Sequence, residues 1–304
     1  MITSFDIGGT TIKAATASAP DALIHLGRLP TPRDDFEAFA AAIGELVERG
    51  GAAPGAPVAI SITGVVDPDT GLVRCANIPC IDGRRLADDL ASRLKAQVHV
   101  ANDGDCFVLA EASAGAGRGH RVVFGVILGT GVGGGLVVDG RLHPGAAGLG
   151  GEWGHGTIVA TKTANRPFEL PHFPCGCGLN GCLDTVGGAR GLERLHAHIH
   201  GDDLASTAIV EAWSAGDAAA GETIALFVEL VARPLALVVN IVGPDIIPVG
   251  GGLANSAALI ARLDEAVRPL ILRRIDRPLV VPAQLTADAG LVGAAALGLM
   301  EPVS

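Results

Sequence analysis

Short apolar runs of strand length alternate with longer segments whose apolar residues recur at helical spacing. At the start of the chain three such runs come in succession, and the acidic pair Asp34 and Asp35 then marks the start of a helix. Strands and helices alternate after it. The predicted strands cover residues 2–6, 12–17, 23–29, 58–62 and 98–100, and the predicted helices cover residues 36–49, 86–94 and 102–114.

A glycine-rich seam at residues 114–120 precedes a second part in which the same order of elements starts again, with one insertion. The repeat lies in the order of elements and not in the sequence itself. Each half begins with two strands joined by a glycine loop, so two facing halves would place both loops over one cleft. In the second half, strands are predicted at 122–128, 136–138, 246–249 and 279–281, and helices at 189–198, 205–213, 219–242, from about 254 to 273, and 290–300.

The composition narrows the class of protein. Of 304 residues, 49% are apolar, 43 are glycine and none is tyrosine, which suits an α/β enzyme with many backbone-led turns. A formal net charge of −10 argues against nucleic acid as a partner, but glycine-rich loops bind phosphate through backbone N–H groups regardless of net charge. Neither a signal peptide nor an uninterrupted apolar stretch of membrane-spanning length is visible, so we expect a cytoplasmic protein.

Three cysteines lie in the glycine-rich run C-G-C-G-L-N-G-C, at Cys175, Cys177 and Cys182. Such a run folds tightly enough to bring three sulfur atoms onto one ion. His155, in the upstream G-E-W-G-H, would complete the closed tetrahedral set that structural zinc prefers. Clustered cysteines without a visible secretory signal favour a metal over disulfides. The alternative is a group of free thiols beside a turn.

Carboxylates at a strand end and beside the cysteine run are candidates for chemistry on a bound molecule. The stretch A-N-D-G-D places Asn102 and Asp103 where Asp103 would accept a proton from an attacking hydroxyl and Asn102 would hold a neighbouring one. Helix capping alone would also explain both residues, and Asp105 is expected to be a solvated helix residue. Glu152 and Asp184 are expected beside the metal, facing one pocket.

Three glycine-rich segments directly follow predicted strands and are candidates for nucleotide binding. D-I-G-G-T is not a Walker A loop, but its glycines admit phosphate oxygens and Asp6 would hold Mg²⁺ through water. L-G-T-G-V-G-G-G occupies the matching place in the second half, and V-G-G-G-L would let adenine or ribose approach a helix start. Ordinary hairpins or a tight strand-to-helix turn are the alternatives. The candidate nucleotide contacts are Asp6, Gly8, Gly9, Thr10, Thr11, Lys13, Gly129, Thr130, Gly131, Gly133, Gly251, Gly252 and Leu253.

Together these motifs resemble the ROK family of sugar kinases and repressors, within the hexokinase and actin-like superfamily. D-I-G-G-T-T-I-K, A-N-D, L-G-T-G-V-G-G-G, E-W-G-H, C-G-C-G-L-N-G-C and V-G-G-G-L occur in family order nearly end to end. The resemblance implies an α/β, duplicated ribonuclease H-like fold of the actin/hexokinase type, with two domains and a cleft between them. It also implies ATP-dependent phosphorylation of a hexose, usually on its 6-hydroxyl. Asp103 would be the general base, and Asn102, Glu152 and His155 would contact the sugar.

Within the family, the chain looks most like N-acetylglucosamine kinases, on the stretches at residues 30–39, 76–79 and 105–112. Two positions depart from the family pattern. Thr63–Gly64 stands where Pro-Gly is common, a version similar to N-acetylmannosamine kinases. Asp184 replaces a glutamate that usually binds the sugar, which withdraws the carboxylate by about 1.5 Å. The candidate sugar contacts are Thr63, Gly64, Asn77, Asn102, Asp103, Glu152, His155 and Asp184.

The expected product is N-acetylglucosamine 6-phosphate, and an N-acetylmannosamine kinase, glucokinase or fructokinase is the alternative. Outside the kinases, a sugar-responsive regulator would carry a helix-turn-helix module, which is not seen before the first strand. The intact Asp6 and Asp103 speak against a non-catalytic sugar-binding protein. We expect domains at residues 1–117 and 118–288, with a closing helix at 289–304 packed on the first domain. We also expect ATP, Mg²⁺ and Zn²⁺ as cofactors, a homodimer, and no nucleic-acid or membrane partner.

Overall fold

Two five-stranded sheets with the same strand order organise the computed structural model, β3-β2-β1-β4-β7 and β10-β9-β8-β11-β12. In the first sheet the early strands pair antiparallel and the later ones parallel. The repeated architecture predicted from the order of elements is confirmed. The strands are β1 Ile2–Ile7, β2 Thr11–Ala17, β3 Leu23–Pro30, β4 Val58–Ile62, β7 Val98–Asn102, β8 Val122–Leu128, β9 Val132–Val138, β10 Arg141–Leu142, β11 Ile247–Gly250 and β12 Val280–Pro282, with a small ribbon of β5 Val65–Val66 and β6 Val73–Arg74.

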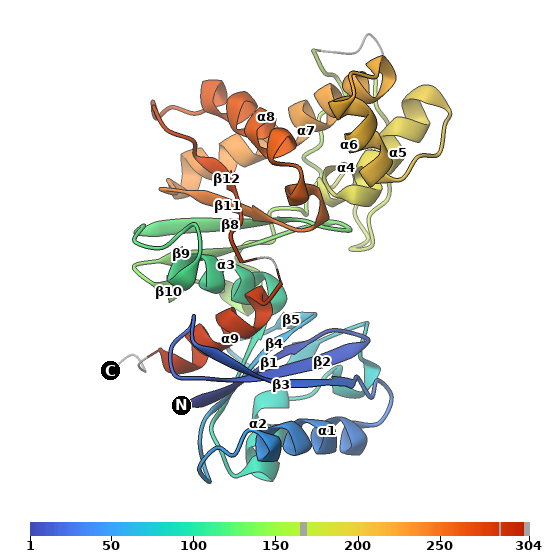
Figure 1. Cartoon of the computed structure of the whole chain (residues 1–304). Helices are drawn as coiled ribbons and strands as arrows, with labels where there is room; N and C mark the ends of the chain where they lie inside the picture. Colours follow the sequence, from blue (N-terminus) through green and yellow to red (C-terminus); the bar gives the residue numbers. More distant parts are fainter. Residues whose placement is uncertain (165–168, 286, 301–304) are drawn as a thin grey trace. The chain divides into compact units, whose positions relative to one another are not determined.

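Helices cover both faces of the first sheet. Figure 1 shows α1 and α2 on one face and α9 on the other. The side chain of Asp35 accepts hydrogen bonds from the backbone N–H groups of Glu37 and Ala38, so it begins α1 as the sequence predicts. The helices are α1 Phe36–Arg49, α2 Leu86–Leu94, α3 Asp103–Ala114, α4 Asp184–Gly187, α5 Ala189–His200, α6 Ser206–Ser214, α7 Ala218–Val242, α8 Ala257–Val267 and α9 Ala289–Leu299.

The structure describes residues 1–164, 169–285 and 287–300, which divide into two units. Unit 1 contains Met1–Gly119, Gly135–Gly151 and the described part of Leu285–Ser304, and unit 2 contains His120–Gly134 and the described part of Glu152–Gln284. The domain boundaries expected at residues 117 and 288 stay a prediction. Residues 165–168 and 286 of the predicted second domain, and 301–304 of the predicted closing helix, lie outside the described residues.

The second glycine-rich segment forms a shorter turn than the sequence predicts. β9 begins at Val132 and not at residue 136, so Gly133 belongs to a strand. A Cβ atom on Gly134 would lie 2.8 Å from the carbonyl oxygen of Gly125 and 2.9 Å from the Trp153 ring. Glycine inside a strand often marks such a close approach by a neighbouring group. The strand therefore continues through residues that sequence pattern alone assigned to a loop.

The prediction for the helix after the third glycine segment was wrong at its end. α8 stops at Val267 rather than near residue 273, and a 3₁₀ turn over Arg268–Leu270 replaces its last turn. Pro269 explains the stop, because proline has no backbone N–H to continue the hydrogen-bond pattern of the helix. At its start, the glycine segment first forms a 3₁₀ turn, Gly252–Asn255. α8 therefore does not begin directly at the glycines.

The helix α7 is the central helix of unit 2. Among the described residues it alone has the length and apolar composition of a helix that could cross a membrane. However, 56% of its most apolar window is buried, and α5, α6 and α8 pack against it. A core helix of a globular unit has the same composition, so this helix is weak support for a membrane span.

Helices α3 and α9 pack so closely that a side chain at Gly293 has no room. A Cβ atom there would overlap the backbone carbonyl of Cys106. We expect Gly293→Ala to lower the free energy of unfolding by about 3 kcal/mol, since overpacking forces backbone shifts. Gly44→Ala in α1 is the matched control, because its nearest atom would be Leu94 Cδ2 at 3.9 Å. That variant should gain up to about 1 kcal/mol from helix propensity.

Denaturant-induced unfolding followed by circular dichroism measures both glycine variants. Equal stability of Gly293→Ala and the wild type would contradict the close packing of α3 on α9.

Candidate functional site

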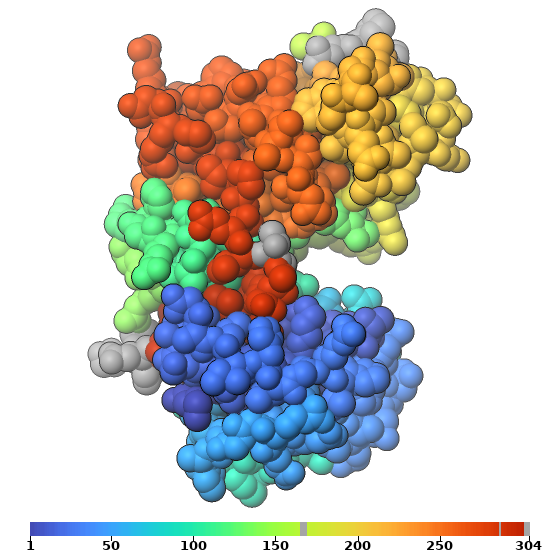
Figure 2. Space-filling model, viewed as in Figure 1, coloured from blue at the N-terminus to red at the C-terminus, as the bar shows by residue number. Residues whose placement is uncertain are grey.

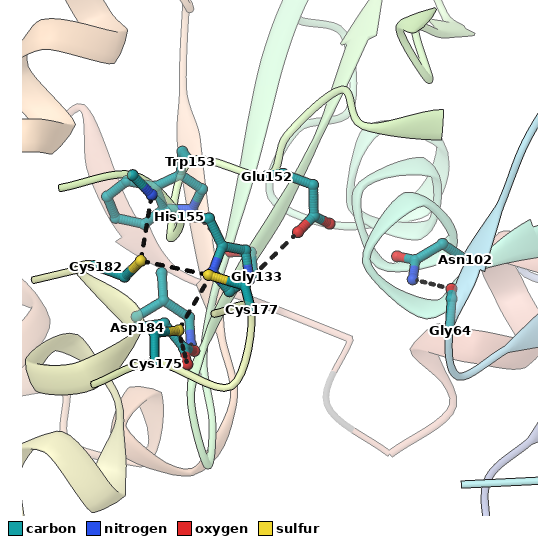
Figure 3. A network of polar contacts seen from close by, with 12 residues as sticks. Gly64, Asn102, Gly133, Glu152, Trp153, His155, Cys175, Cys177, Cys182 and Asp184 are labelled. Carbon is teal, nitrogen blue, oxygen red and sulfur yellow. Dashed lines mark hydrogen bonds and ion pairs between the residues drawn. The ribbon is translucent and has the colours of Figure 1, made fainter. Parts of the chain in front are cut away.

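The carboxyl ends of β1, β4 and β7 gather the predicted site residues of unit 1. Parallel strands present these ends at one edge of a sheet, the edge at which open α/β sheets bind ligands. The Asn102 side-chain N–H donates to the carbonyl oxygen of Gly64 at 2.6 Å, as Figure 3 shows, and the Asn77 amide donates to the Thr63 hydroxyl at 3.4 Å. Asn77 also lies against the β1–β2 turn, since a Cβ on Gly9 would be 3.4 Å from its Cβ. Four separate segments thus meet at this edge.

Gly64 is required by the backbone at this edge. Its φ of +114° lies in the region that side chains avoid, and a Cβ atom would lie 2.5 Å from the carbonyl oxygen of Arg74. The Thr-Gly version of the loop therefore keeps the glycine that the fold needs. Thr63 supplies a hydroxyl that a proline at the same place would not.

Asp103 is the first residue of α3, and its carboxylate is solvent-exposed. The cap of this helix is Asn102, whose Oδ1 accepts from Gly104 N at 2.6 Å, while Asp103 Oδ1 accepts from the same N–H at 2.9 Å. Asn102 therefore has a capping role, as one interpretation of the sequence held. Capping uses only the amide oxygen. The amide nitrogen carries two N–H groups, and one of them donates to Gly64.

Asp105 is buried, with only 6% of its surface exposed, so the expectation of a solvated side chain was wrong. Every residue of α3 from Gly104 to Glu111 is buried, so this part of the helix is enclosed by the core on all sides.

Asp6 lies at the end of β1 beside Lys13, with 3.1 Å between the carboxylate Oδ2 and the ammonium nitrogen. A Cβ atom on Gly290, in the first turn of α9, would lie 2.5 Å from the carboxylate of Asp6. The start of α9 thus packs directly on this side chain. The carboxylate keeps 27% of its surface exposed, and its oxygens are hard ligands of the kind Mg²⁺ prefers.

In unit 2, the four predicted metal ligands lie together. Their ligand atoms are all within 4.8 Å of one another. Cys177 Sγ is 3.6 Å from Cys182 Sγ, and Cys175 Sγ is 3.7 Å from His155 Nδ1 (Figure 3). Around a tetrahedral zinc with bonds of about 2.3 Å, two sulfur ligands lie about 3.8 Å apart. The donor set and its spacing therefore fit a zinc ion.

Two of the thiols have shifted proton affinities. Burial raises the pKa of Cys175 to about 11. A hydrogen bond from the backbone N–H of Leu179 lowers the pKa of Cys177 to about 7, so this thiol gives up its proton the more readily of the two.

The second ring nitrogen of His155 faces Glu152, with 3.6 Å between Nε2 and the carboxylate oxygen. His155 therefore presents Nδ1 to the cysteines and Nε2 to an acidic side chain. A carboxylate on the far nitrogen orients a metal-binding imidazole and raises its basicity.

The β8–β9 turn, residues 129–131, is held by the segment that follows the cysteine run. The backbone N–H of Ala189 donates to the carbonyl oxygen of Gly129 at 2.7 Å, and that of Arg190 donates to Thr130 at 3.3 Å. Asp184 Oδ1 accepts from the backbone N–H of Val132 at 2.8 Å. Asp184 was predicted to contact a sugar, and the structure places one of its oxygens on the glycine turn.

A cavity of about 300 Å³ lies beside the third glycine segment in unit 2. Gly252 and Leu253, which the sequence predicted as nucleotide contacts, line this cavity, and the sequence predicted none of the lining residues that α6 contributes. Nothing in the sequence of α6 resembles a nucleotide-binding motif, so only the fold shows that α6 lines this cavity. In Figure 2, α5 and α6 form a surface layer drawn in yellow and gold. The cavity is lined by Ala189, Ser206, Thr207, Val210, Glu211, Gly252, Leu253, Asn255 and Ser256.

A family model described as "ROK family" matches residues 2–301. The chain belongs to the ROK family. It is 38% identical over 300 residues to the N-acetylgalactosamine kinase AgaK of Shewanella sp. (strain ANA-3), which covers 98% of this chain and 96% of that protein. It is 35% identical over 305 residues to the N-acetyl-D-glucosamine kinase of Mannheimia succiniciproducens, covering 99% of this chain and all of that protein. A solved ROK family glucokinase from Streptomyces griseus, in complex with glucose and AMPPNP, matches with a TM-score of 0.74 at 28% identity, covering 98% of each chain.

Membership of the ROK family confirms the fold class that the motifs implied. The site residues predicted for a ROK protein are all described, and each unit holds its own group. Unit 1 carries Asp6, Gly8, Gly9, Thr10, Thr11, Lys13, Thr63, Gly64, Asn77, Asn102 and Asp103; unit 2 carries Gly129, Thr130, Gly131, Gly133, Glu152, His155, Cys175, Cys177, Cys182, Asp184, Gly251, Gly252 and Leu253.

Proposed function

We propose that this chain is an ATP-dependent sugar kinase that phosphorylates the 6-hydroxyl of N-acetylglucosamine. The observation that carries the proposal is the exposed Asp103, which lies at the carboxyl edge of the first sheet, the edge where Asn77 and Asn102 bond to Thr63 and Gly64. A kinase acceptor site needs one base and several groups that orient hydroxyls. Relatives named as N-acetyl-D-glucosamine kinases, similar over their full length, support the sugar.

In the proposed reaction, Asp103 accepts the proton of the attacking 6-hydroxyl, and Asn102 holds a neighbouring hydroxyl through its second amide N–H. Phosphoryl transfer depends mainly on positioning and on neutralising charge, so a carboxylate of ordinary basicity suffices. The glycine turns of both units offer backbone N–H groups to the phosphates. Mg²⁺, held by Asp6 through water, would neutralise charge on the phosphates.

We also propose that the cavity beside Leu253 takes the adenine of ATP. Its wall combines Leu253 and Val210 with polar groups of Ser206 and Glu211, the mixture that a flat heterocycle with N–H groups requires. Gly251 and Gly252 carry no side chain, so the adenine ring could lie directly against the backbone there.

A structural zinc ion on His155, Cys175, Cys177 and Cys182 completes the proposal. The site is closed by four protein ligands, so zinc would hold the segment in shape and not take part in chemistry. It would keep Glu152 and His155 in place as sugar contacts.

N-Acetylgalactosamine is a second candidate substrate. The 38% identical relative over 98% of this chain is named for that sugar, which differs from N-acetylglucosamine only in the configuration at C4. Contacts to the 4-hydroxyl would then decide between the two.

A sugar panel tests the proposed function. Initial rates with Mg-ATP, coupled to ADP release, are measured for N-acetylglucosamine, N-acetylgalactosamine, N-acetylmannosamine, glucose, mannose and fructose. We expect the highest kcat/KM with N-acetylglucosamine, and phosphate on O6 of the product by NMR. A preference for N-acetylgalactosamine would select the second candidate. A preference for N-acetylmannosamine or an unacetylated sugar would point to Thr63 and Asp184 as the cause. No turnover with any sugar would refute the kinase proposal.

The localisation, the oligomeric state and the partners of the protein are part of the same proposal. We propose a cytoplasmic homodimer that acts on small molecules, with neither nucleic acid nor membrane as a partner. The net charge of −10 supports the exclusion of nucleic acid. Size-exclusion chromatography with light scattering measures the oligomeric state directly.

A further inference from the structure

The glycine turn that precedes β9 is fixed by a side chain from the metal-bearing segment, the stretch from Glu152 to Asp184 that holds the four proposed zinc ligands. Asp184, two residues after Cys182, accepts the backbone N–H of Val132 at 2.8 Å. It lies so close to Gly131 that a Cβ atom on that glycine would overlap its Oδ1. The carboxylate thus caps the turn at the point where the chain enters the strand. An ionised acceptor on a backbone N–H is among the stronger hydrogen bonds in proteins.

The other end of the same segment fixes the next residue of the strand. The indole N–H of Trp153 donates to the carbonyl oxygen of Gly133 at 2.9 Å. The backbone N–H of Asp184 donates to the carbonyl oxygen of Gly154 at 2.9 Å, which ties the two ends together. Consecutive residues of β9 are therefore held by side chains that flank the proposed zinc ligands on both sides. Trp153 is nearly buried, at 9% exposed, so this arrangement is part of the core of unit 2.

The length of the side chain at position 184 matters for this bond. One more methylene would carry the carboxylate about 1.5 Å further along. With the backbone of Gly131 already in contact, a glutamate could not keep the same hydrogen bond without moving the turn. Aspartate is therefore the acid that fits the backbone N–H of Val132.

We propose that Asp184 is a positioning residue for the nucleotide phosphates, acting through the turn at residues 129–131. The proposal rests on the proposed kinase function, and it gives Asp184 a task other than the sugar contact expected from the family pattern. The turn offers its N–H groups to phosphate oxygens, and such groups bind well only when their directions are fixed in advance. Asp184 fixes them from the metal-bearing segment.

The test measures nucleotide and sugar affinity separately in Asp184 variants. The Kd for the non-hydrolysable analogue AMPPNP with Mg²⁺ is measured by calorimetry, along with KM for ATP, KM for the sugar, and zinc content. We expect Asp184→Ala to raise the Kd for AMPPNP and the KM for ATP about 10-fold, while the KM for the sugar and the zinc content stay within about 2-fold. Asp184→Asn keeps an oxygen acceptor of the same size and should restore nucleotide affinity to within about 2-fold of the wild type.

A second variant guards against misfolding of the first. Trp153→Phe keeps the ring that packs edge-on against Phe124 but removes the N–H that donates to Gly133. It should raise the Kd for AMPPNP about 3-fold.

Each outcome separates this inference from the proposed function. A wild-type enzyme that phosphorylates a sugar, with an Asp184→Ala variant of unchanged nucleotide affinity and weakened sugar affinity, would overturn the inference alone. A wild type that phosphorylates no sugar, but whose affinity for AMPPNP falls about 10-fold in Asp184→Ala, would refute the kinase proposal and leave only the role of Asp184 in nucleotide binding. A wild type that binds no nucleotide would overturn both.

Discussion

Replacing Asp103 with alanine is expected to lower kcat for sugar phosphorylation by about 10³-fold, within the usual range for loss of a general base. The KM for the sugar should change only a few-fold, because Asn77 and Asn102 keep their own positions through bonds to Thr63 and Gly64. Steady-state kinetics with ATP and N-acetylglucosamine measures both quantities. Asp103 also lies in the first turn of α3, so loss of its charge should lower the free energy of unfolding by about 0.5 kcal/mol. The melting temperature of the variant is therefore measured as well.

Two further variants test whether Asp103 acts as a base, and not only through its charge or its place in the helix. Asp103→Asn keeps the shape and the bond from Gly104 but cannot accept the proton, so it should be as inactive as the alanine variant. Asp88→Asn removes an exposed acid from the first turn of α2 in the same unit and should leave kcat within about 2-fold. An Asp103→Asn enzyme with near wild-type kcat would show that another group takes the proton.

The sequence analysis was most successful for residues whose spacing is dictated by their shared chemistry. Three thiols and an imidazole that share an ion must lie within a few ångströms, and the run from Cys175 to Cys182 has few ways to fold that do not bring them together. The order of strands and helices along the chain was equally accessible, because buried parallel strands appear as continuous apolar runs. In both cases the positions of the residues along the chain were enough to predict the feature.

Features that depend on packing between distant segments could not be predicted from the sequence. The burial of Asp105 follows from what encloses α3 and not from its own polarity. The cavity wall from α6 requires the fold to bring Val210 beside Leu253. Likewise, the family pattern predicts a sugar contact for the side chain at position 184. Its hydrogen bond with the backbone N–H of Val132 could be found only from the structure.

Loss of the metal should affect both substrates, since the segment that carries the ligands also fixes the turn before β9. We expect Cys177→Ser to lose zinc, lower the melting temperature by more than about 5 °C and reduce kcat/KM for the sugar at least about 100-fold. The physical reason is that a closed zinc site would supply folding free energy to the glycine-rich cysteine run, whose residues 176–180 are all exposed. Metal analysis, thermal melting and kinetics measure the three effects, and hydrogen exchange should show lost protection at residues 152–164 and 169–184.

The control for the metal prediction is Cys80→Ser in unit 1. This thiol is partly buried, whereas Cys177 is exposed, and its Sγ lies 3.4 Å from the carbonyl oxygen of Pro32, a bond that a serine hydroxyl can replace. It should leave zinc content and activity unchanged. If the Cys177→Ser protein is free of zinc yet melts at the wild-type temperature and keeps full activity, zinc has no structural role. If it loses sugar affinity but binds AMPPNP normally, the metal supports Glu152 and His155 alone, and Asp184 holds its place beside Val132 without it.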